Sequence, residues 1–486
     1  MKNSKLQPSS NKKQSSMLSL VQNDLDLIVE QVGGLWEDFR DGRVFLTGGT
    51  AFFGVWILAS LQAANKAHGL ACQVVVLSRN PNAFLAKFPE FNDDPMISFV
   101  TGDVRNFIYP KGDFTHVIHG AVETRKGGAP SAIALLDVLS NGTQRVLEFA
   151  GQSGVKKFLF LSSGAVYGAI AQDSEGVDEN EPSNLLPQDI NATLGVGKFS
   201  AEHLCAQFAK LHDIDIKIAR CFTFVGPFMP MQGKLAIGNF IADAINKNTI
   251  QINSDGASIR SYMYVTELMV WLWNILVRHN SPLPINVGSN TKISIKDLAI
   301  LTSNIVAPQK NIAVKCKETK SKFRSTYLPS IKRAEEQLGL VDNTNLNAAI
   351  SKTADWYEKW FILYESQQKE SLEIKKAAFK PKIFVCDIDG VVARLTSEND
   401  YSKSSPNVKM IAAINALYDA GHSIIMFTAR GTVTGINWQD VTQNQLQSWG
   451  LRYHELHFGK PAADYYVDDR MISIAALTEM SNLDNL

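Results

Sequence analysis

The chain has 486 residues, more than one ordinary hydrophobic core accommodates, so we expect two or three domains. Hydrophobic residues make up 45% and charged residues 20% of the chain, as in a folded globular protein. Lysine plus arginine and aspartate plus glutamate both total 48, so no bulk charge favours a nucleic acid or a membrane surface as partner. Phosphorylated ligands would have to be held by local sites.

The N-terminal residues, the length of the apolar runs and the cysteines indicate the cellular compartment of the protein. The first 22 residues are basic and rich in serine, asparagine and glutamine, without the apolar segment of a secretory signal. We expect residues 1–22 to be a disordered tail; a transit peptide is less favoured because arginine is absent. No apolar run reaches the length of a membrane span. The five cysteines are widely spaced in apolar runs, which predicts buried free thiols and a cytoplasmic protein.

Short β-rich runs alternate with longer helical patterns from residue 43 to about residue 300, which is typical of βαβ units on a parallel sheet. The strands expected there are RVFLTG, QVVVLSR, ISFVTGD, THVIHGA, KKFLFLSS and IKIARCF. Residues 365–380 are charged and predict a linker helix or hinge. A smaller alternating segment follows, with strands near KIFVCDI, SIIMFTAR and DYYVDDR. The expected fold class is α/β, with one domain over 23–364 and a second over 381–486.

A glycine turn follows the first expected strand, in VFLTGGTAFFG. A buried strand before such a turn and an apolar helix after it form the context in which the turn binds a dinucleotide. Gly48 permits the tight turn, and Gly54 lets helix and strand pack closely while backbone N–H groups face a pyrophosphate. Ala51 replaces the middle glycine and narrows the approach of the phosphates. Taken alone the turn is weak evidence, since many such turns use glycine structurally.

The second expected strand ends in Ser78 and Arg79, where NAD-specific proteins usually carry an acid for the ribose hydroxyls. Arginine can pair bidentately with a 2′-phosphate. NADP is therefore favoured over NAD, which stays possible, and a solvated surface arginine is the structural alternative.

A series of motifs covers residues 43–360 in a fixed order: TGGTAFFG, TGDVRNF, HVIHGA, NGTQRVLEFA, FLSSGAVYG, IARCFTFVGP, GASIRSYMYVTEL and INVGSNTKISIKDLA. In this order they resemble the extended short-chain dehydrogenases, the NAD(P)-dependent epimerases and dehydratases of nucleotide sugars. The resemblance implies a Rossmann-type doubly wound parallel sheet, a nucleotide-sugar substrate and a homodimer. The dimer would form through two long helices near 131–152 and 195–212, although a monomer would bury the same apolar faces on its own sheet.

The resemblance also assigns roles to single residues. Ser163 corresponds to the catalytic serine that hydrogen-bonds the reacting oxygen of the sugar, and Arg260 to an arginine that binds the diphosphate. Asp103 corresponds to a residue near the adenine. A turn former and a surface residue are the structural alternatives for Asp103 and Arg260. The residues expected to bind the cofactor are Gly48, Gly49, Thr50, Phe52, Phe53, Gly54, Ser78, Arg79, Asp103, Val104, Ala121 and Lys198.

The catalytic tyrosine of this family has no counterpart here. LGVGKFSAE fits the frame YGxxK…AE, with Lys198 as the catalytic lysine and Leu194 at the tyrosine position. A tyrosine near a lysine has a lowered pKa, and its phenolate form accepts the proton of a carbinol. Leucine cannot do this. Gly164 and Ala165 replace the acidic pair of the 4,6-dehydratases, and Tyr167 is the family's structural tyrosine. Either another residue transfers the proton, or the domain is a catalytically silent binding or dimerisation module serving the second domain.

Two aspartates, Asp387 and Asp389, end an apolar strand before a glycine turn in KIFVCDIDGVVA. Carboxylates two residues apart on an extended chain point to opposite sides, so only a turn beginning there lets both converge. Thr428 ends the strand of IIMFTARG, and Lys460 follows in FGKPAADYYVDD.

These motifs, in order over residues 381–486, resemble the haloacid dehalogenase-like phosphatases. The resemblance implies that Asp387 is the nucleophile, that Asp389 protonates the leaving group and then activates water, and that Thr428 and Lys460 hold the phosphoryl oxygens. The expected ligands of Mg²⁺ are Asp387, Asp389, Asp468 and Asp469. For any single aspartate a helix cap or turn is the structural alternative.

The spacing of these motifs leaves no room for a full cap domain, so we expect an open site that takes a large substrate or borrows its lid. Together the two resemblances predict a bifunctional protein of nucleotide-sugar or surface-polysaccharide biosynthesis. Its second substrate would be a sugar phosphate or a related phosphomonoester.

Overall fold

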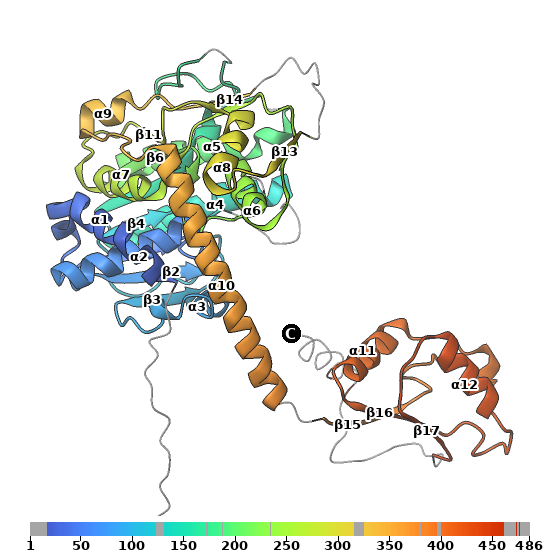
Figure 1. The fold of residues 1–486 in the computed structure, drawn as a ribbon. Helices are drawn as coiled ribbons and strands as arrows, with labels where there is room; N and C mark the ends of the chain where they lie inside the picture. Colours follow the sequence, from blue (N-terminus) through green and yellow to red (C-terminus); the bar gives the residue numbers. More distant parts are fainter. Residues whose placement is uncertain are drawn as a thin grey trace, which may run out of the picture. The chain divides into compact units, whose positions relative to one another are not determined.

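The computed structural model describes residues 17–122, 131–171, 174–186, 188–233, 235–314, 325–378, 381–395 and 400–460, together with 473 and 476. The chain divides into two compact units, a first unit over Met1–Ser366 and a second over Gln367–Leu486 (Figure 1).

The first unit begins with helices inside and after the segment expected to be a tail. They are η1 (Leu18–Val21), α1 (Gln22–Val32) and η2 (Gly33–Phe39), where η denotes a 3₁₀ helix. Leu18 and Val21 are buried, and so are Trp36 and Phe39. Ordered structure therefore starts within the predicted tail, whose residues 1–16 lie outside the described residues.

A parallel seven-stranded sheet forms the centre of the first unit, in the order β11-β6-β5-β4-β1-β2-β3. Its strands are β1 (Arg43–Thr47), β2 (Gln73–Ser78), β3 (Ile97–Thr101), β4 (His116–His119), β5 (Lys157–Ser163), β6 (Asp215–Cys221) and β11 (Ile285–Val287). The order reverses between β1 and β4, and open α/β sheets bind ligands at the carboxyl ends of strands beside such a reversal. The predicted Rossmann-type sheet and its six expected strands are confirmed.

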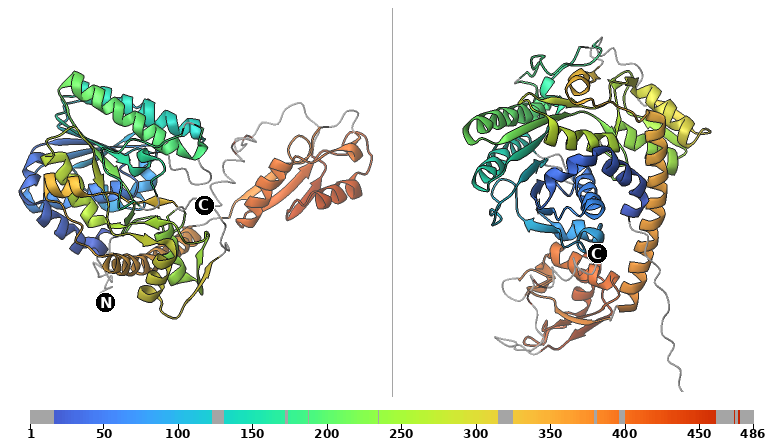
Figure 2. Two further views of the ribbon diagram at one scale, coloured as in Figure 1. Left: turned by 90° about the horizontal axis from the view of Figure 1, so that it is seen from above. Right: turned by 90° about the vertical axis from the view of Figure 1, so that its left-hand side faces the viewer.

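Helices cover both faces of this sheet. The helices of the unit after η2 are α2 (Phe52–His68), α3 (Pro81–Leu85), α4 (Ala132–Gln152), α5 (Thr193–His212), α6 (Ala236–Asn246), α7 (Val265–Arg278), α8 (Ile295–Val306) and α9 (Lys332–Leu338), with short turns η3 (Pro89–Phe91), η4 (Gly164–Tyr167) and η5 (Ile190–Ala192). α4 and α5 run side by side over one face (Figure 2), and α1, α2 and α7 pack on the other. Successive residues of β1 alternate between them: Val44 and Leu46 join the α2 side and Phe45 the α4 side.

Short strands build the remainder of the unit, in three small sheets. These are β10 (Met263–Tyr264) with β7 (Phe224–Val225), β13 (Asn311–Val314) with β8 (Thr249–Ile252), and the group β12 (Ile293–Ser294), β9 (Ile259–Arg260) and β14 (Thr326–Tyr327). The last group matters most, because β9 pairs Arg260 with Tyr327 of β14.

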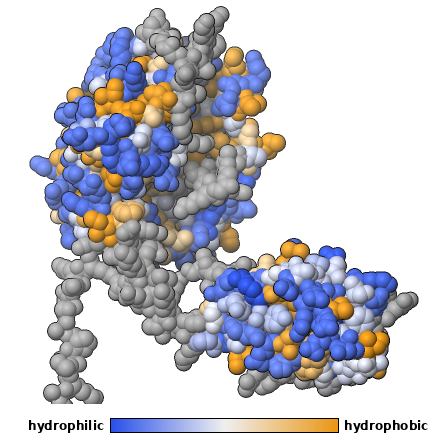
Figure 3. Space-filling model, turned by 45° about the vertical axis from the view of Figure 1, so that its right-hand side comes forward, coloured by the Kyte–Doolittle hydropathy of each residue, from blue (hydrophilic) through white to orange (hydrophobic). Residues whose placement is uncertain are grey.

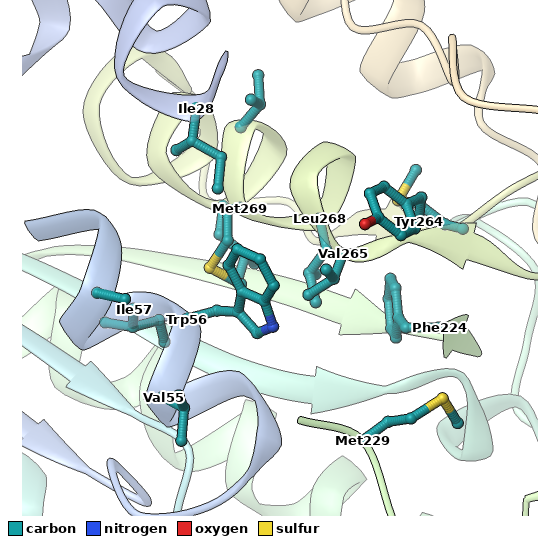
Figure 4. Close-up of a cluster of buried hydrophobic side chains, with 14 of the residues drawn as sticks. Ile28, Val55, Trp56, Ile57, Phe224, Met229, Tyr264, Val265, Leu268 and Met269 are labelled. Carbon is teal, nitrogen blue, oxygen red and sulfur yellow. The ribbon is translucent and has the colours of Figure 1, made fainter. Parts of the chain in front are cut away.

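Large buried side chains fix the position of α2. Figure 4 shows Trp56 of α2 among residues from α1 and α7. Ile28, Trp56 and Leu268 have no exposed surface, and the indole N–H of Trp56 donates to Pro227 O at 2.9 Å. Burying a side chain of this size stabilises a fold by about 1.5–3 kcal/mol. The helix that carries the glycine turn at its N-terminus is therefore firmly seated.

The long helix α10 (Leu346–Ala378) begins in the first unit and ends within the range of the second. Its early residues Ala349, Ile350 and Ala354 are buried. The linker expected over 365–380 lies in this helix up to residue 378.

The second unit has a three-stranded parallel sheet, β15-β16-β17. Its elements are β15 (Ile383–Asp387), η7 (Tyr401–Lys403), α11 (Val408–Asp419), β16 (Ser423–Thr428), α12 (Gln439–Ser448) and β17 (Glu455–Phe458). Ile414, Ile424 and Met426 have no exposed surface and lie in one apolar core. The strands expected near KIFVCDI and SIIMFTAR are confirmed, whereas DYYVDDR lies outside the described residues.

The surface composition and the buried thiols are as the sequence predicts, within the residues that the structure describes. Hydrophilic residues predominate on the displayed faces of both units, with small hydrophobic groups between them (Figure 3). Four cysteines, Cys72, Cys205, Cys221 and Cys386, are buried free thiols, and Cys316 lies outside the described residues. Within the described part of the chain, no helix is long and apolar enough to cross a membrane.

Candidate functional site

The turn after β1 requires glycine for steric reasons. Gly48 has φ +76°, and a Cβ there would lie 2.5 Å from Gly120 O at the end of β4. A Cβ on Gly54 would lie 2.3 Å from the carbonyl carbon of Gly49. Side chains at these positions would therefore collide with backbone, and the bare turn leaves a cradle at the point where the strand order reverses.

The start of α2 fits an anionic group. Ala51 is its N-cap and makes no side-chain hydrogen bond to the first turn. The N–H groups of Phe52 and Phe53 belong to that first turn, which has no acceptors within the helix. Thr50 is exposed at the turn, and Phe52 and Phe53 are half-buried. These backbone donors match the chemistry of a dinucleotide pyrophosphate.

A hydrogen-bonded chain of fixed direction supports the same turn. The Thr143 hydroxyl donates to Leu139 O at 2.6 Å and lies 3.0 Å from His119 Nε2, so this nitrogen carries the proton. His119 Nδ1 therefore accepts from the Thr47 hydroxyl at 2.6 Å, and Thr47 Oγ1 accepts from the Ala121 N–H at 3.3 Å. Burial lowers the pKa of His119 to about 3, so the imidazole is neutral. Ala121 is thus held at the carboxyl end of β4.

The carboxyl ends of β2 and β3 bring charged residues together. Ser78 is buried and Arg79 is exposed. Both carboxylate oxygens of Asp103 accept from Arg105, at 2.7 and 2.9 Å. These hydrogen bonds hold the pKa of Asp103 below its usual range, with a smaller contribution from the charge of Arg79. Val104, the next residue, is buried.

Lys198 points into the protein interior. Its Nζ donates to Leu161 O at 2.6 Å and lies 4.5 Å from the ring centroid of Phe160. Burial lowers the pKa of Lys198 to about 8. Leu194 lies half-buried one turn earlier on α5. The helix therefore presents an alkyl side chain one turn before Lys198.

Ser163, the last residue of β5, faces a different phenol. Its Oγ accepts from the Ala165 N–H at 3.2 Å and lies 3.4 Å from Tyr327 Oη. A Cβ on Gly164 would stand 2.8 Å from that same Tyr327 oxygen. The absence of a side chain at Gly164 therefore makes room for the phenol.

Arg260 lies beside this phenol. Its guanidinium carbon is 6.0 Å from the ring centroid of Tyr327, and its nitrogens donate to Ile259 O, Ser325 O and Ser325 Oγ at 2.7–3.0 Å. Burial lowers the pKa of Arg260, because a desolvated cation is less stable. A positive charge therefore stands close to the Tyr327 ring.

Tyr167 belongs to a buried polar network. Its hydroxyl donates to Asn286 Oδ1 at 2.7 Å and accepts from Arg220 at 2.9 Å. Arg220 is also paired with Glu202 at 2.7 Å, and Ser162 donates to the same carboxylate. The Tyr167 hydroxyl both donates and accepts a hydrogen bond within the interior, which agrees with a structural role for this residue.

The second unit gathers its expected residues at the carboxyl ends of β15 and β16. Lys460 Nζ forms an ion pair with Asp387 Oδ2, and Asp387 Oδ1 accepts from the Ile388 N–H at 2.8 Å. Thr428 is fully buried at the end of β16, and its carbonyl accepts from the Lys460 N–H at 3.1 Å. The nucleophile, the threonine and the lysine of the predicted site therefore meet.

The carboxylate of Asp389 pairs with an arginine and not with Lys460. Arg430 holds both of its oxygens, with Nη2 2.7 Å from Oδ1 and Nε 2.9 Å from Oδ2. The same guanidinium donates to Gln445 Oε1 at 2.8 Å and lies 4.8 Å from the ring centroid of Tyr401. A cavity of about 280 Å³ adjoins it, lined by Arg430, Gly431, Thr432, Ile436, Asn437, Trp438, Gln439, Phe458 and Gly459.

The proposed metal ligands are only partly within the described residues. Asp387 and Asp389 are described, whereas Asp468 and Asp469 are not. Across the described ranges, no three His, Cys, Asp or Glu side chains cluster as a metal would require. Asp387 has the hard oxygen donors that Mg²⁺ prefers, whereas both oxygens of Asp389 accept from Arg430.

Two residues of these sites were not singled out from the sequence. Arg430 follows Thr428 by two positions and was visible as the end of FTAR, but its partner Asp389 lies 41 residues away. Tyr327 lies 164 residues from Ser163 and outside every quoted motif. No signal in the sequence could have paired it with Ser163.

The comparisons with known proteins concern the first unit. Residues 44–288 match the family model described as "NAD dependent epimerase/dehydratase family". The dTDP-glucose 4,6-dehydratase of Streptomyces antibioticus is 25% identical over 325 residues, which cover 65% of this chain and 92% of that protein. UDP-glucuronic acid decarboxylase 6 of Arabidopsis thaliana is 24% identical over 298 residues, which cover 61% and 83%.

Solved structures share the fold. The epimerase Mth375 of Methanothermobacter thermautotrophicus superposes with a TM-score of 0.55 at 21% identity, covering 70% of this chain and 98% of that one. MoeE5, in complex with UDP-glucose and NAD, gives a TM-score of 0.54 at 22% identity, covering 66% and 100%. The match of a family model to half of the chain, together with the seven-stranded sheet and its glycine turn, leads to one conclusion: the chain belongs to the NAD dependent epimerase/dehydratase family.

Proposed function

We propose that the chain is bifunctional in nucleotide-sugar or surface-polysaccharide biosynthesis. Its first unit binds NADP and a nucleotide sugar in the manner of sugar epimerases and dehydratases, and its second unit is a phosphatase for a sugar phosphate or related phosphomonoester. The observation that carries the first activity is the bare Gly48 turn and the Ser163 hydroxyl, both at the carboxyl edge of one sheet.

Similar proteins support the choice of ligands. The relatives carry the names of enzymes that act on dTDP-glucose and UDP-glucuronic acid. MoeE5 was solved with UDP-glucose and NAD, and a dTDP-glucose 4,6-dehydratase of Bacillus anthracis with NAD. A dinucleotide and a nucleotide sugar are therefore the ligands proposed for the first unit.

The residues proposed to hold the dinucleotide are the Gly48 turn, the first N–H groups of α2 and Arg79. The nicotinamide cofactor, when bound, exchanges a hydrogen and its electron pair with a carbon of the sugar. Arg79 is exposed at the end of β2, and its guanidinium would pair bidentately with a 2′-phosphate. Ser163 would orient the reacting oxygen of the sugar, and Arg260 would bind the diphosphate.

In the second unit, Asp387 would attack the phosphorus and displace the alcohol, which takes a proton from Asp389. Water then attacks the aspartyl-phosphate as Asp389 removes its proton, so that Asp387 is regenerated and phosphate leaves. Lys460 is placed to neutralise the charge of Asp387 and of a phosphoryl oxygen. Bound Mg²⁺ would be held by Asp387 with Asp468 and Asp469, and it would stabilise the negative charge of the phosphoryl group.

The loss of the family's tyrosine favours a second candidate for the first unit. Leu194 offers no proton, and the amino group of Lys198 donates to Leu161 O. A unit that binds both ligands without turnover, and presents substrate to the phosphatase, is consistent with this geometry.

A homodimer through α4 and α5 is part of the proposal. Ile133 of α4 is 81% exposed and Phe199 of α5 is 48% exposed. Apolar side chains on the outer surface of two adjacent long helices suit a four-helix contact with a second copy.

One experiment tests both activities. Purified protein is incubated with a panel of nucleotide sugars and sugar phosphates, while nicotinamide absorbance and phosphate release are followed in parallel. We expect phosphate release to require Mg²⁺ and to disappear in Asp387→Asn, because an amide is a far poorer nucleophile than a carboxylate. Asp419→Asn, at the exposed end of α11 in the same unit, is the control. Full phosphate release by Asp387→Asn contradicts the proposal.

A further inference from the structure

We propose that Tyr327 takes over the role of the missing helix tyrosine: its Oη exchanges a proton with the reacting oxygen of the nucleotide sugar bound at Ser163. The inference rests on the proposed function of the first unit. It names a catalytic residue that lies outside the helix on which the family places its phenol.

The first argument is position. Tyr327 Oη is 3.4 Å from Ser163 Oγ, a distance that a movement of a few tenths of an ångström turns into an ordinary hydrogen bond. The two residues come from β14 and β5, and β14 is fixed by its pairing with β9. An oxygen bound by Ser163 therefore lies within reach of this phenol, as general acid–base catalysis requires.

The second argument is space. A side chain at Gly164 would begin 2.8 Å from Tyr327 Oη and 2.7 Å from the ring of Phe222. The acidic residue of the 4,6-dehydratases and the Tyr327 phenol thus exclude one another. This chain has Leu194 at the family's tyrosine position and Gly164 at an acidic position, and the Tyr327 phenol lies in the space that a side chain at Gly164 would fill. One phenol at a new position therefore explains both differences from the family.

The third argument is charge. Burial raises the pKa of Tyr327 to about 12, so the phenol holds its proton at neutral pH. Ser163 and Arg260 oppose this effect, because a hydrogen bond and a nearby cation stabilise the phenolate. Arg260 thereby gives the phenolate of Tyr327 electrostatic support.

The proton balance follows. In the direction of reduction the sugar is a ketone: as its carbonyl carbon gains a hydrogen with an electron pair from reduced NADP, the Oη–H bond of Tyr327 breaks and an O–H bond forms on the sugar oxygen. The phenolate then takes a proton from water. In the direction of oxidation the phenolate accepts the carbinol proton, and the positive charge of the oxidised cofactor favours that form of Tyr327.

Removal of the phenol tests the role directly. We expect Tyr327→Phe to lower turnover of the nucleotide sugar found in the screen by about a hundred- to ten-thousand-fold, the usual contribution of a general acid or base. Tyr109→Phe is the matched control, since Tyr109 is also a half-buried phenol but donates to Arg145 O away from Ser163. We further expect Leu194→Tyr to rescue Tyr327→Phe, because it returns a phenol to the family position. Undiminished turnover by Tyr327→Phe overturns the inference.

A second readout does not depend on turnover. Protein labelled with ¹³C at the tyrosine Cζ is titrated by NMR, and the signal that Tyr327→Phe lacks is assigned to Tyr327. We expect oxidised NADP to lower the pH midpoint of this signal by at least about one unit and to leave that of Tyr109 unchanged. If calorimetry detects NADP binding but the Tyr327 midpoint stays fixed, the inference is wrong while the proposed function stands. If NADP does not bind, both fail.

Discussion

Two guanidinium nitrogens of Arg430 donate hydrogen bonds to the carboxylate of Asp389, and the side chain of this arginine is completely buried. A carboxylate held in this way has a single orientation, which the proposed base that takes a proton from the attacking water needs. We predict that Arg430→Gln lowers phosphate release by about ten- to a hundred-fold, even with saturating Mg²⁺. Initial rates on the best substrate of the screen measure this. Arg452→Gln, which removes an exposed pair with Asp419 in the same unit, should keep its rate.

Arg79 should set the preference for the cofactor. We predict that Arg79→Ala weakens NADP binding by about 10- to 100-fold, because a hydrogen-bonded ion pair with the 2′-phosphate contributes about 1.5–3 kcal/mol. Binding of NAD, which has no such phosphate, should change little. Calorimetry with both dinucleotides measures the ratio, and Arg40→Ala is the control on another exposed arginine. Equal losses for NAD and NADP would contradict this role.

The outer surface of α5 should hold two copies of the chain together. Val196 and Phe199 are 38% and 48% exposed. We predict that wild-type protein has the mass of a dimer in light scattering and that Val196→Glu with Phe199→Glu gives a monomer, because carboxylates cannot be buried there unpaired. Ile300→Glu, at a similarly exposed apolar position on α8, should leave the dimer intact. A wild-type monomer refutes the interface.

Asp342 should make the first unit less stable as the pH rises from about 4 to 6. Burial raises its pKa to about 6, whereas the unfolded value is about 3.9, so the folded chain binds more protons in this interval. We predict that Asp342→Asn raises the free energy of unfolding at pH 7, by about 3 kcal/mol, and brings no gain at pH 4. Urea titrations at both pH values measure this. The exposed Asp113→Asn should not change the pH dependence.

The central sheet could be predicted because its strands are continuous apolar runs between helical patterns. Val44, Phe45 and Leu46 of β1 are all buried, as expected of a strand covered on both faces. The N-terminal helices escaped prediction, since a polar, basic start conceals the buried Leu18 and Val21 that follow it. Their burial depends on α2 and α7, which the local sequence does not reveal.

The sites were predictable to the extent that their residues lie at strand ends. Asp387 and Thr428 end neighbouring parallel strands, and this alone brings them to one edge. The contacts of Asp389 with Arg430 and of Ser163 with Tyr327 join segments 41 and 164 residues apart. Such pairs depend on how loops close over the sheet, and no periodicity of the sequence encodes that.

The chain of hydrogen bonds from Ala121 through Thr47 and His119 to Thr143 can run in only one sense. It would lose that sense if the imidazole gained a second proton, because Nδ1 would become a donor facing the Thr47 hydroxyl. Since burial keeps the pKa of His119 at about 3, the imidazole does not gain a second proton at any pH found in cells. The histidine therefore keeps a constant separation between α4 and the glycine turn after β1, and this turn keeps its shape over the physiological range of pH.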